Sequence, residues 1–243
     1  MLTTRVDRYV LRAVRALWLL DPRQSPFHSA LAQQFVDARS PDAVPVDQSR
    51  CILGSMVRSD TPTPVILLNG ASSSGKTSIA LALQDQLGRP SIHLSEDAFF
   101  DMAMGARLGG TAAERVYGIQ VLLGLYRCIG IFAALDLTVV VDVVLEERAW
   151  LHECLERLDG FDVLFVGVQC PLAELERRER ARPDRTHVGL SRSHFERVHA
   201  HGVYDLEVDS STMTPGAAAQ LIIRALEQDR PFTAFAHLKV AGY

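Results

Sequence analysis

The sequence predicts an α/β protein of three layers (α/β/α), with helices on both faces of a mostly parallel, five-stranded sheet. From residue 64 onward, short apolar runs alternate with amphipathic segments about five times, which is typical of a doubly wound sheet. The run Thr138–Val141 is continuous and β-branched, as expected for a strand that is buried on both faces. Of the 243 residues, 48% are hydrophobic and 22% are charged, so the chain can bury a substantial core.

Two parts of the chain differ in character, and we expect a boundary near residue 62. Residues 1–62 read as an N-terminal helical extension followed by a proline-containing linker, and residues 63–243 as the α/β domain. Apolar residues recur at helical spacing over residues 1–20, while four arginines form a stripe on another face: Arg5, Arg8, Arg12 and Arg15. Such a basic amphipathic helix either docks on its own protein or binds a partner, and the sequence leaves both open.

The first predicted strand, residues 65–69, leads into a loop of glycine and serine, and an apolar-periodic helix begins at Ile79. The spacing fits the P-loop pattern G-x-x-x-x-G-K-[ST], in which glycines let successive backbone N–H groups point at a phosphate. A Gly/Ser-rich turn without function is the alternative, but the strand before and the helix after favour the P-loop, and with it the P-loop NTPase type of fold. We predict that ATP binds to Gly70, Ala71, Ser72, Ser73, Ser74, Gly75, Lys76, Thr77 and Ser78. Within this set, Lys76 would reach the β- and γ-phosphates, and the Thr77 hydroxyl would hold Mg²⁺.

The second predicted strand, Ser91–Ser95, ends at two adjacent acids, Glu96 and Asp97. Ligands of open α/β sheets bind beyond the carboxyl ends of the strands, so this acidic pair is a candidate for catalysis. Phenylalanines and methionines follow over residues 99–104 and either line a pocket for an apolar substrate or belong to the core.

A long helical pattern over residues 114–134 precedes the third predicted strand, which ends at Asp142. This is the Walker-B position, where a carboxylate holds Mg²⁺ directly or through water. The alternative is an aspartate that caps the next helix, residues 146–158.

The fourth predicted strand, residues 162–168, is followed by a strongly charged helix over residues 172–180. Two arginines, Arg182 and Arg185, lie in the loop that follows. A solvated surface explains many such charges, but phosphoryl-transfer enzymes also use loop arginines to stabilise the transferring group.

The remaining patterns predict a helix over 191–200, a short strand over 204–209 and a closing helix over 215–226. His199 and His201 suggest a metal pair at first sight, but no further ligands follow at a suitable spacing.

Composition disfavours several classes of protein. The net charge is −4 and the pI is about 6.1, so the chain has no overall positive charge that would attract nucleic acid. No apolar run is long enough for a transmembrane segment. The four cysteines lie far apart, so neither a zinc site nor a disulfide framework is expected, and a cytoplasmic location is the default. A homo-oligomer is compatible with the sequence.

Four separated stretches between residues 64 and 230 resemble the chloramphenicol phosphotransferase-like family of P-loop kinases. They read ILLNGASSSGKTSIA, HLSEDAFFDM, VLFVGVQCPLAELERRERARPDR and FERVHAHGVYDLEVDSS. The resemblance implies ATP-dependent phosphorylation of a hydroxyl on a small molecule, with Asp97 as general base. It also implies that Lys76 and the loop amides bind the phosphates, and that Arg182 and Arg185 belong to a lid.

The chain departs from the family pattern at two places in this region. The third strand of the family ends in two aspartates, whereas here Asp142 is followed by Val143. Glu96 directly before Asp97 is a second departure. Because side chains alternate in an extended segment, we expect only one of these two acids to face the site, and we choose Asp97.

The acceptor expected from the resemblance is an antibiotic-like molecule or a related metabolite. A kinase for a nucleoside, a nucleotide sugar or a cofactor precursor is the alternative on the same scaffold. A nucleotide-dependent switch without transfer activity is a third hypothesis. It is disfavoured because the chain lacks the N-K-x-D motif of guanine-specific switches and the L-S-G-G-Q motif of transporter ATPases.

Overall fold

The computed structural model describes residues 64–103, 111–135, 137–182, 189–228 and 230–243. The predicted N-terminal extension, residues 1–62, and the predicted lid residue Arg185 lie outside these ranges.

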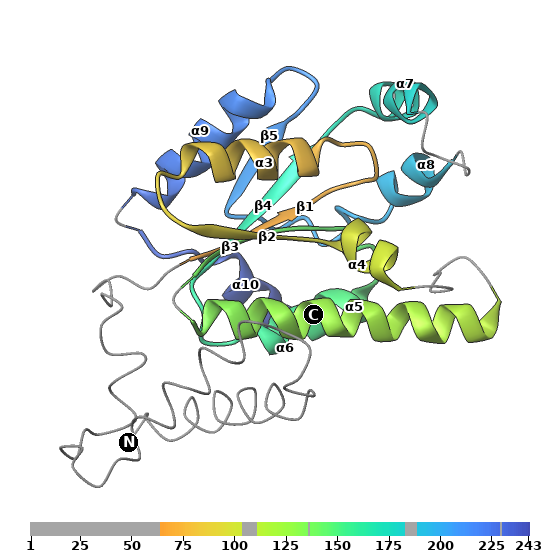
Figure 1. Ribbon diagram of the computed structural model, residues 1–243, viewed down its shortest axis with the longest axis horizontal. Coiled ribbons are helices and arrows are strands. Elements are labelled where there is room, and N and C mark those ends of the chain that lie inside the picture. The colour runs from red at the N-terminus through yellow and green to blue at the C-terminus, as the bar shows by residue number, and fades with distance from the viewer. Residues whose placement is uncertain (1–63, 104–110, 136, 183–188, 229) are drawn as a thin grey trace, which may run out of the picture. The chain divides into compact units, whose positions relative to one another are not determined.

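Five strands form one parallel sheet, as the sequence predicts (Figure 1). They are β1 (Val65–Asn69), β2 (Ser91–Ser95), β3 (Thr138–Val143), β4 (Val163–Gln169) and β5 (Leu206–Asp209). Their order is β2-β3-β1-β4-β5, and all four neighbouring pairs are parallel. After β1 the chain passes to the edge strand β2, returns to β3 beside β1, and then crosses to β4 and β5 on the other side. The loop after β1 therefore lies where the strand order reverses, the switch point at which such sheets bind ligands.

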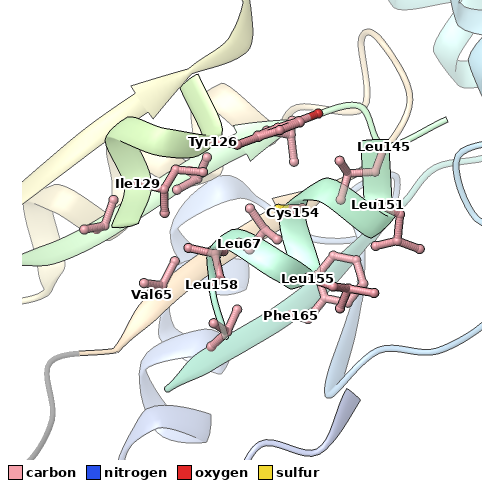
Figure 2. Packing of buried hydrophobic residues seen from close by; sticks show 14 of the residues in the cluster. Val65, Leu67, Tyr126, Ile129, Leu145, Leu151, Cys154, Leu155, Leu158 and Phe165 are labelled. Atoms are coloured by element: carbon pink, nitrogen blue, oxygen red, sulfur yellow. The ribbon is translucent and has the colours of Figure 1, made fainter. Parts of the chain in front are cut away.

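Helices cover both faces of the sheet (Figure 1). On one face lie α3 (Lys76–Gln86) and α9 (Pro215–Leu226), and on the other lie α5 (Ala112–Ala133), α6 (Arg148–Arg157) and α10 (Ala234–Val240). Because side chains alternate along a strand, Val65 and Leu67 enter the core under α5 and α6, whereas Ile66 and Leu68 enter the core under α3 and α9. Figure 2 shows the first of these cores, where Phe165 of β4 packs among helix side chains.

Helix α5 is long and apolar enough to cross a membrane, judged by length and composition alone. Its residues Leu122, Leu125 and Ile129 are buried in the core against β1 and β3. A capping box at its N-terminus, where Thr111 and Glu114 exchange hydrogen bonds, fixes where the helix begins. We therefore interpret α5 as a core helix of this domain.

Three short helices lie beyond the carboxyl ends of the strands: α4 (Glu96–Met102), α7 (Leu172–Ala181) and α8 (Leu190–Phe195). Helix α8 is shorter than the predicted helix over 191–200, because it ends at Phe195 and residues 196–201 form turns. The sequence analysis also missed α10, a helix of two turns that is too short to show a clear period.

The phenylalanines of α4 belong to the core. Phe99 and Phe100 pack against the cluster under α5, so the core interpretation is confirmed for both. Met102 is exposed, and Met104 lies outside the described residues.

Candidate active site

The parallel register brings three predicted site segments to one edge of the sheet. Asp142 in β3 lies opposite Leu68 of β1 on one side and Ser95 of β2 on the other. The phosphate loop follows β1 directly, and the acidic pair follows β2 directly. The loop, the acidic pair and Asp142 are therefore neighbours.

A cavity of about 840 Å³ lies at this edge of the sheet. Its walls come from the phosphate loop, the first turn of α4, the end of β3, α7, α8 and the start of α9. The side chains that bear on the chemistry are Ser72, Ser73, Lys76, Thr77, His93, Glu96, Asp97, Asp101, Asp142, Arg178, Arg182 and His194.

The phosphate loop has the conformation that its glycines predict. Gly75 has φ of 87° and ends the loop at the start of α3, so the N-terminus of this helix points into the cavity. Lys76 is buried, and its Nζ donates to the carbonyls of Gly70 at 2.8 Å and Ala71 at 2.9 Å. The ammonium group therefore already lies across the mouth of the loop.

The serine run of the loop holds unused hydrogen-bonding capacity. Within the described residues, the buried hydroxyls of Ser72, Ser73 and Ser74 have no hydrogen-bond partner. Buried polar atoms in proteins are nearly always paired, so the hydroxyls of Ser72 and Ser73, two residues that line the cavity, fit a ligand with acceptor oxygens, such as a phosphate. Ser73 also has φ of 64°, the only positive φ among the described residues other than glycine.

Asp142 has a partner that the sequence analysis missed. His93 of β2 lies across the strand pair, and its Nε2 is 3.2 Å from Asp142 Oδ2. Burial opposes ionisation of Asp142, but hydrogen bonds from His93 and Thr77 and the charge of Lys76 outweigh it and lower its pKa. An ionised carboxylate beside the Thr77 hydroxyl is an oxygen pair that suits Mg²⁺.

Glu96 and Asp97 both line the cavity, although we expected only one of them to face it. The alternation argument fails because both residues lie in the first turn of helix α4 and not in an extended segment. The Glu96 carboxylate accepts a hydrogen bond from the Val144 amide at 2.9 Å, whereas Asp97 is exposed toward the cavity. Burial raises the pKa of Glu96 to about 7, with Asp97 and Asp142 contributing repulsion.

Helix α7 brings arginines to the cavity. Arg182, predicted from the sequence, lies just after α7 and lines the cavity. The sequence analysis missed Arg178, which donates to Ser210 O at 2.7 Å and to Glu174 at 2.7 Å, with Nη1 3.5 Å from Ser74 O. Glu174 and Arg178 are spaced by four residues and thus share one face of α7, a signal that was present in the sequence.

Helix α8 is fastened to the phosphate loop. Ser191 Oγ donates to the Ser72 carbonyl at 3.2 Å, and the Ser72 amide donates to His194 Nδ1 at 3.3 Å. The buried carboxylate of Glu179 accepts from the amides of Gly189 and Ser191. Glu179 precedes the predicted lid arginines in the chain and Gly189 follows them, so these hydrogen bonds join the residues on either side of them.

The histidine pair does not form a metal site with other residues that the structure describes, since no group of three suitable ligands occurs there. His199 Nδ1 is 2.7 Å from the Tyr204 hydroxyl, and the His201 ring stacks on Phe165.

Known proteins are similar to this chain over the α/β domain. The family described as chloramphenicol phosphotransferase-like protein matches residues 63–227. A Mycobacterium tuberculosis protein named "Putative O-phosphotransferase" is 32% identical over 173 residues, which cover 62% of this chain and 76% of that protein.

Solved structures share the fold at lower identity. The APS kinase CysC of Mycobacterium tuberculosis, in complex with AMPPNP and APS, has a TM-score of 0.55 and 22% identity, covering 69% of this chain and 99% of that chain. A sugar kinase from Janibacter sp. has a TM-score of 0.53 and 20% identity, covering 68% of this chain and 95% of that chain.

Proposed function

The chain belongs to the chloramphenicol phosphotransferase-like family, and we propose that it transfers the γ-phosphoryl group of ATP to a hydroxyl of an antibiotic-like small molecule or related metabolite. Its relatives and its fold make it a phosphotransferase of the kinase class. The nature of the nucleotide, the metal and the acceptor is the part that we propose.

One observation carries the proposal: a phosphate loop, exposed acids and arginines line a single cavity. The loop side has unpaired serine hydroxyls and a helix N-terminus, both of which suit phosphates. The same cavity is lined by Asp97 of α4, whose carboxylate an acceptor hydroxyl could approach.

Each side chain would have a separate task in the transfer. Asp97 accepts the proton of the acceptor hydroxyl and orients its oxygen for in-line attack. Lys76 holds the β- and γ-phosphates, and Arg182 neutralises charge that develops on the transferring group. Arg185 would join Arg182 in this role, as the family resemblance implies.

The residues present fit a magnesium ion. Thr77 and the ionised Asp142 would hold it, and His93 would orient the carboxylate through the hydrogen bond already in place. Bound Mg²⁺ would supply positive charge that offsets the charge of the phosphates.

The three cysteines that the structure describes are free, which fits the reducing cytoplasm that we propose as the compartment.

A direct test is a screen of hydroxylated small molecules with purified full-length protein, ATP and Mg²⁺. The panel should hold chloramphenicol, other antibiotics with free hydroxyls, nucleosides, nucleotide sugars and cofactor precursors. Release of ADP and product mass are both measured. A phosphorylated antibiotic supports the proposed acceptor class, and a phosphorylated nucleoside or precursor supports the alternative kinase.

A further inference from the structure

The buried side-chain amide of Asn69 forms hydrogen bonds that connect the end of β1 with residues that follow β3 and α8. Asn69, the last residue of β1, is fully buried. Its Oδ1 accepts from the Leu145 amide at 2.8 Å, and its Nδ2 donates to the Val198 carbonyl at 3.0 Å and to the Tyr204 hydroxyl at 2.8 Å. Only an amide side chain supplies an acceptor and two donors here, because an aspartate has no donor for Val198 or Tyr204.

In this network each donor passes to the next acceptor in sequence, from Asn69 to Tyr204 and from Tyr204 to His199. Since the Tyr204 hydroxyl accepts from Asn69, its own proton is directed to His199 Nδ1, which is 2.7 Å away. This requires His199 to be neutral, with Nδ1 unprotonated. Burial and the nearby charge of Lys76 lower the pKa of His199 to about 4, so the ring is neutral at physiological pH.

The tyrosine ring is held so that its hydroxyl meets Asn69. The ring lies 4.7 Å from the Phe165 ring and 4.7 Å from the His201 ring, measured between centroids. It also packs directly on Gly167 of β4, where an added Cβ would lie 2.8 Å from ring atoms. The Val198 carbonyl is a second acceptor within reach of the hydroxyl, but at 3.5 Å it is farther away than His199 Nδ1 at 2.7 Å.

All three segments that meet at Asn69 continue into the cavity wall. Gly70, the next residue after Asn69, receives a hydrogen bond from Lys76. Leu145 follows the strand that carries Asp142, and Val198 follows α8, which contacts Ser72 of the loop. A shift of the Asn69 amide would therefore move the phosphate loop relative to the residues that face it.

We propose that Tyr204 is a positioning residue for nucleotide binding. Through its hydrogen bond with Asn69 it holds the start of the phosphate loop in place, and its own hydroxyl is oriented by the hydrogen bond to His199. This inference rests on the proposed function, because it assumes that the loop binds a nucleotide. It explains a role for the stretch FERVHAHGVYDLEVDSS, which contains none of the proposed catalytic residues. Tyr204 does not line the cavity, so it acts only through Asn69 and the loop.

The test compares two buried tyrosines. Tyr204→Phe keeps the packed ring and removes the hydroxyl that Asn69 and His199 need. Tyr126→Phe is the matched control, because within the described part of the chain the buried Tyr126 hydroxyl has no hydrogen-bond partner. Affinity for AMPPNP with Mg²⁺ is measured by calorimetry on the full chain. We expect Tyr204→Phe to weaken binding about five- to tenfold, the value of one buried hydrogen bond, and Tyr126→Phe to bind as the wild type does.

A second pair of variants keeps the inference testable if Tyr204→Phe folds poorly. His199→Asn places an acceptor near the position of Nδ1, whereas His199→Leu removes it. We expect His199→Leu to weaken AMPPNP binding and His199→Asn to restore most of the affinity. A role in stability alone would lower the melting temperature without this pattern in affinity.

The possible failures can be told apart. If the wild-type protein binds no AMPPNP, the proposed function is wrong and the inference falls with it. If the wild type binds and both Tyr204→Phe and His199→Leu bind equally well, only the positioning role is wrong.

Discussion

At the scale of single residues, the two adjacent acids after β2 have different surroundings and therefore different expected roles. Glu96 is held by the Val144 amide and has a raised pKa, whereas Asp97 is exposed toward the cavity. A base must reach the acceptor hydroxyl, which favours the acid at the cavity surface. The geometry thus supports the choice of Asp97, although the alternation argument behind that choice was wrong.

Asp97→Asn is expected to lower the rate of transfer about 10²- to 10⁴-fold, because general-base assistance is worth about that much. ATP affinity should remain that of the wild type, since we propose that Asp97 contacts the acceptor and not the nucleotide. Single-turnover transfer and nucleotide calorimetry measure the two effects separately. Retained transfer in Asp97→Asn would refute the assignment of the base.

Glu96 predicts a pH dependence of stability in the protein without nucleotide. Burial raises its pKa from an ordinary value of 4.5 to about 7 in the folded protein, so the folded state holds the proton more tightly. The free energy of unfolding contributed by Glu96 is therefore fully present below pH 4.5 and is lost as the pH rises toward 7. Urea unfolding at several pH values should show a smaller decline in Glu96→Gln than in the wild type. If Glu96→Gln and the wild type lose stability equally as the pH rises, the Glu96 carboxyl does not have a raised pKa in the folded protein.

Ser73 combines a left-handed backbone with an unpaired hydroxyl in the cavity wall. Ser73→Gly should raise the free energy of unfolding by up to about 1 kcal/mol, because glycine adopts this conformation without strain. Nucleotide affinity should fall, because the hydroxyl is lost. Ser72→Gly is the control, since Ser72 is a buried neighbour whose φ is not positive, and it should be destabilising. A less stable Ser73→Gly would show that the strain is absent.

At the scale of elements, the close approach of the phosphate loop to β4 depends on Gly70. An added Cβ would lie 2.6 Å from the Val168 carbonyl. Gly70→Ala should therefore displace the loop, lower stability by roughly 1–3 kcal/mol and weaken nucleotide binding. Gly124→Ala in α5 is the matched control, because nothing lies within 4 Å of its added Cβ. This control should gain about 0.5–1 kcal/mol, and a Gly70→Ala variant as stable as the wild type would contradict the packing.

The elements that could be predicted are those with a strong local pattern. The β-branched run of β3, the glycine–serine loop and the amphipathic α9 carry their signals in consecutive residues. Helix α8 was predicted too long, since it ends at Phe195 and residues 196–201 form turns. Partners such as His93 with Asp142 come from neighbouring strands 49 residues apart, and single-sequence patterns do not contain such pairings.

At the scale of the whole molecule, the described residues contain the five-stranded sheet and the cavity. We propose that residues 63–243 form an independent domain, as the composition of the chain predicts. A variant that lacks residues 1–60 should melt cooperatively and bind AMPPNP with wild-type affinity, because no described cavity residue is removed. Calorimetry and size-exclusion chromatography check both affinity and oligomeric state. Loss of the melting transition would show that the extension belongs to the fold.

The central claim is that this cavity transfers a phosphoryl group to an alcohol and does not merely hydrolyse ATP. The most direct measurement is the molar ratio of phosphorylated product to ADP, determined by mass spectrometry with the acceptor that the screen identifies. The proposed mechanism predicts a ratio near one for the wild type, and product formation about 10²- to 10⁴-fold slower for Asp97→Asn despite intact AMPPNP binding. ADP release without any phosphorylated product, for every acceptor class in the panel, would contradict it.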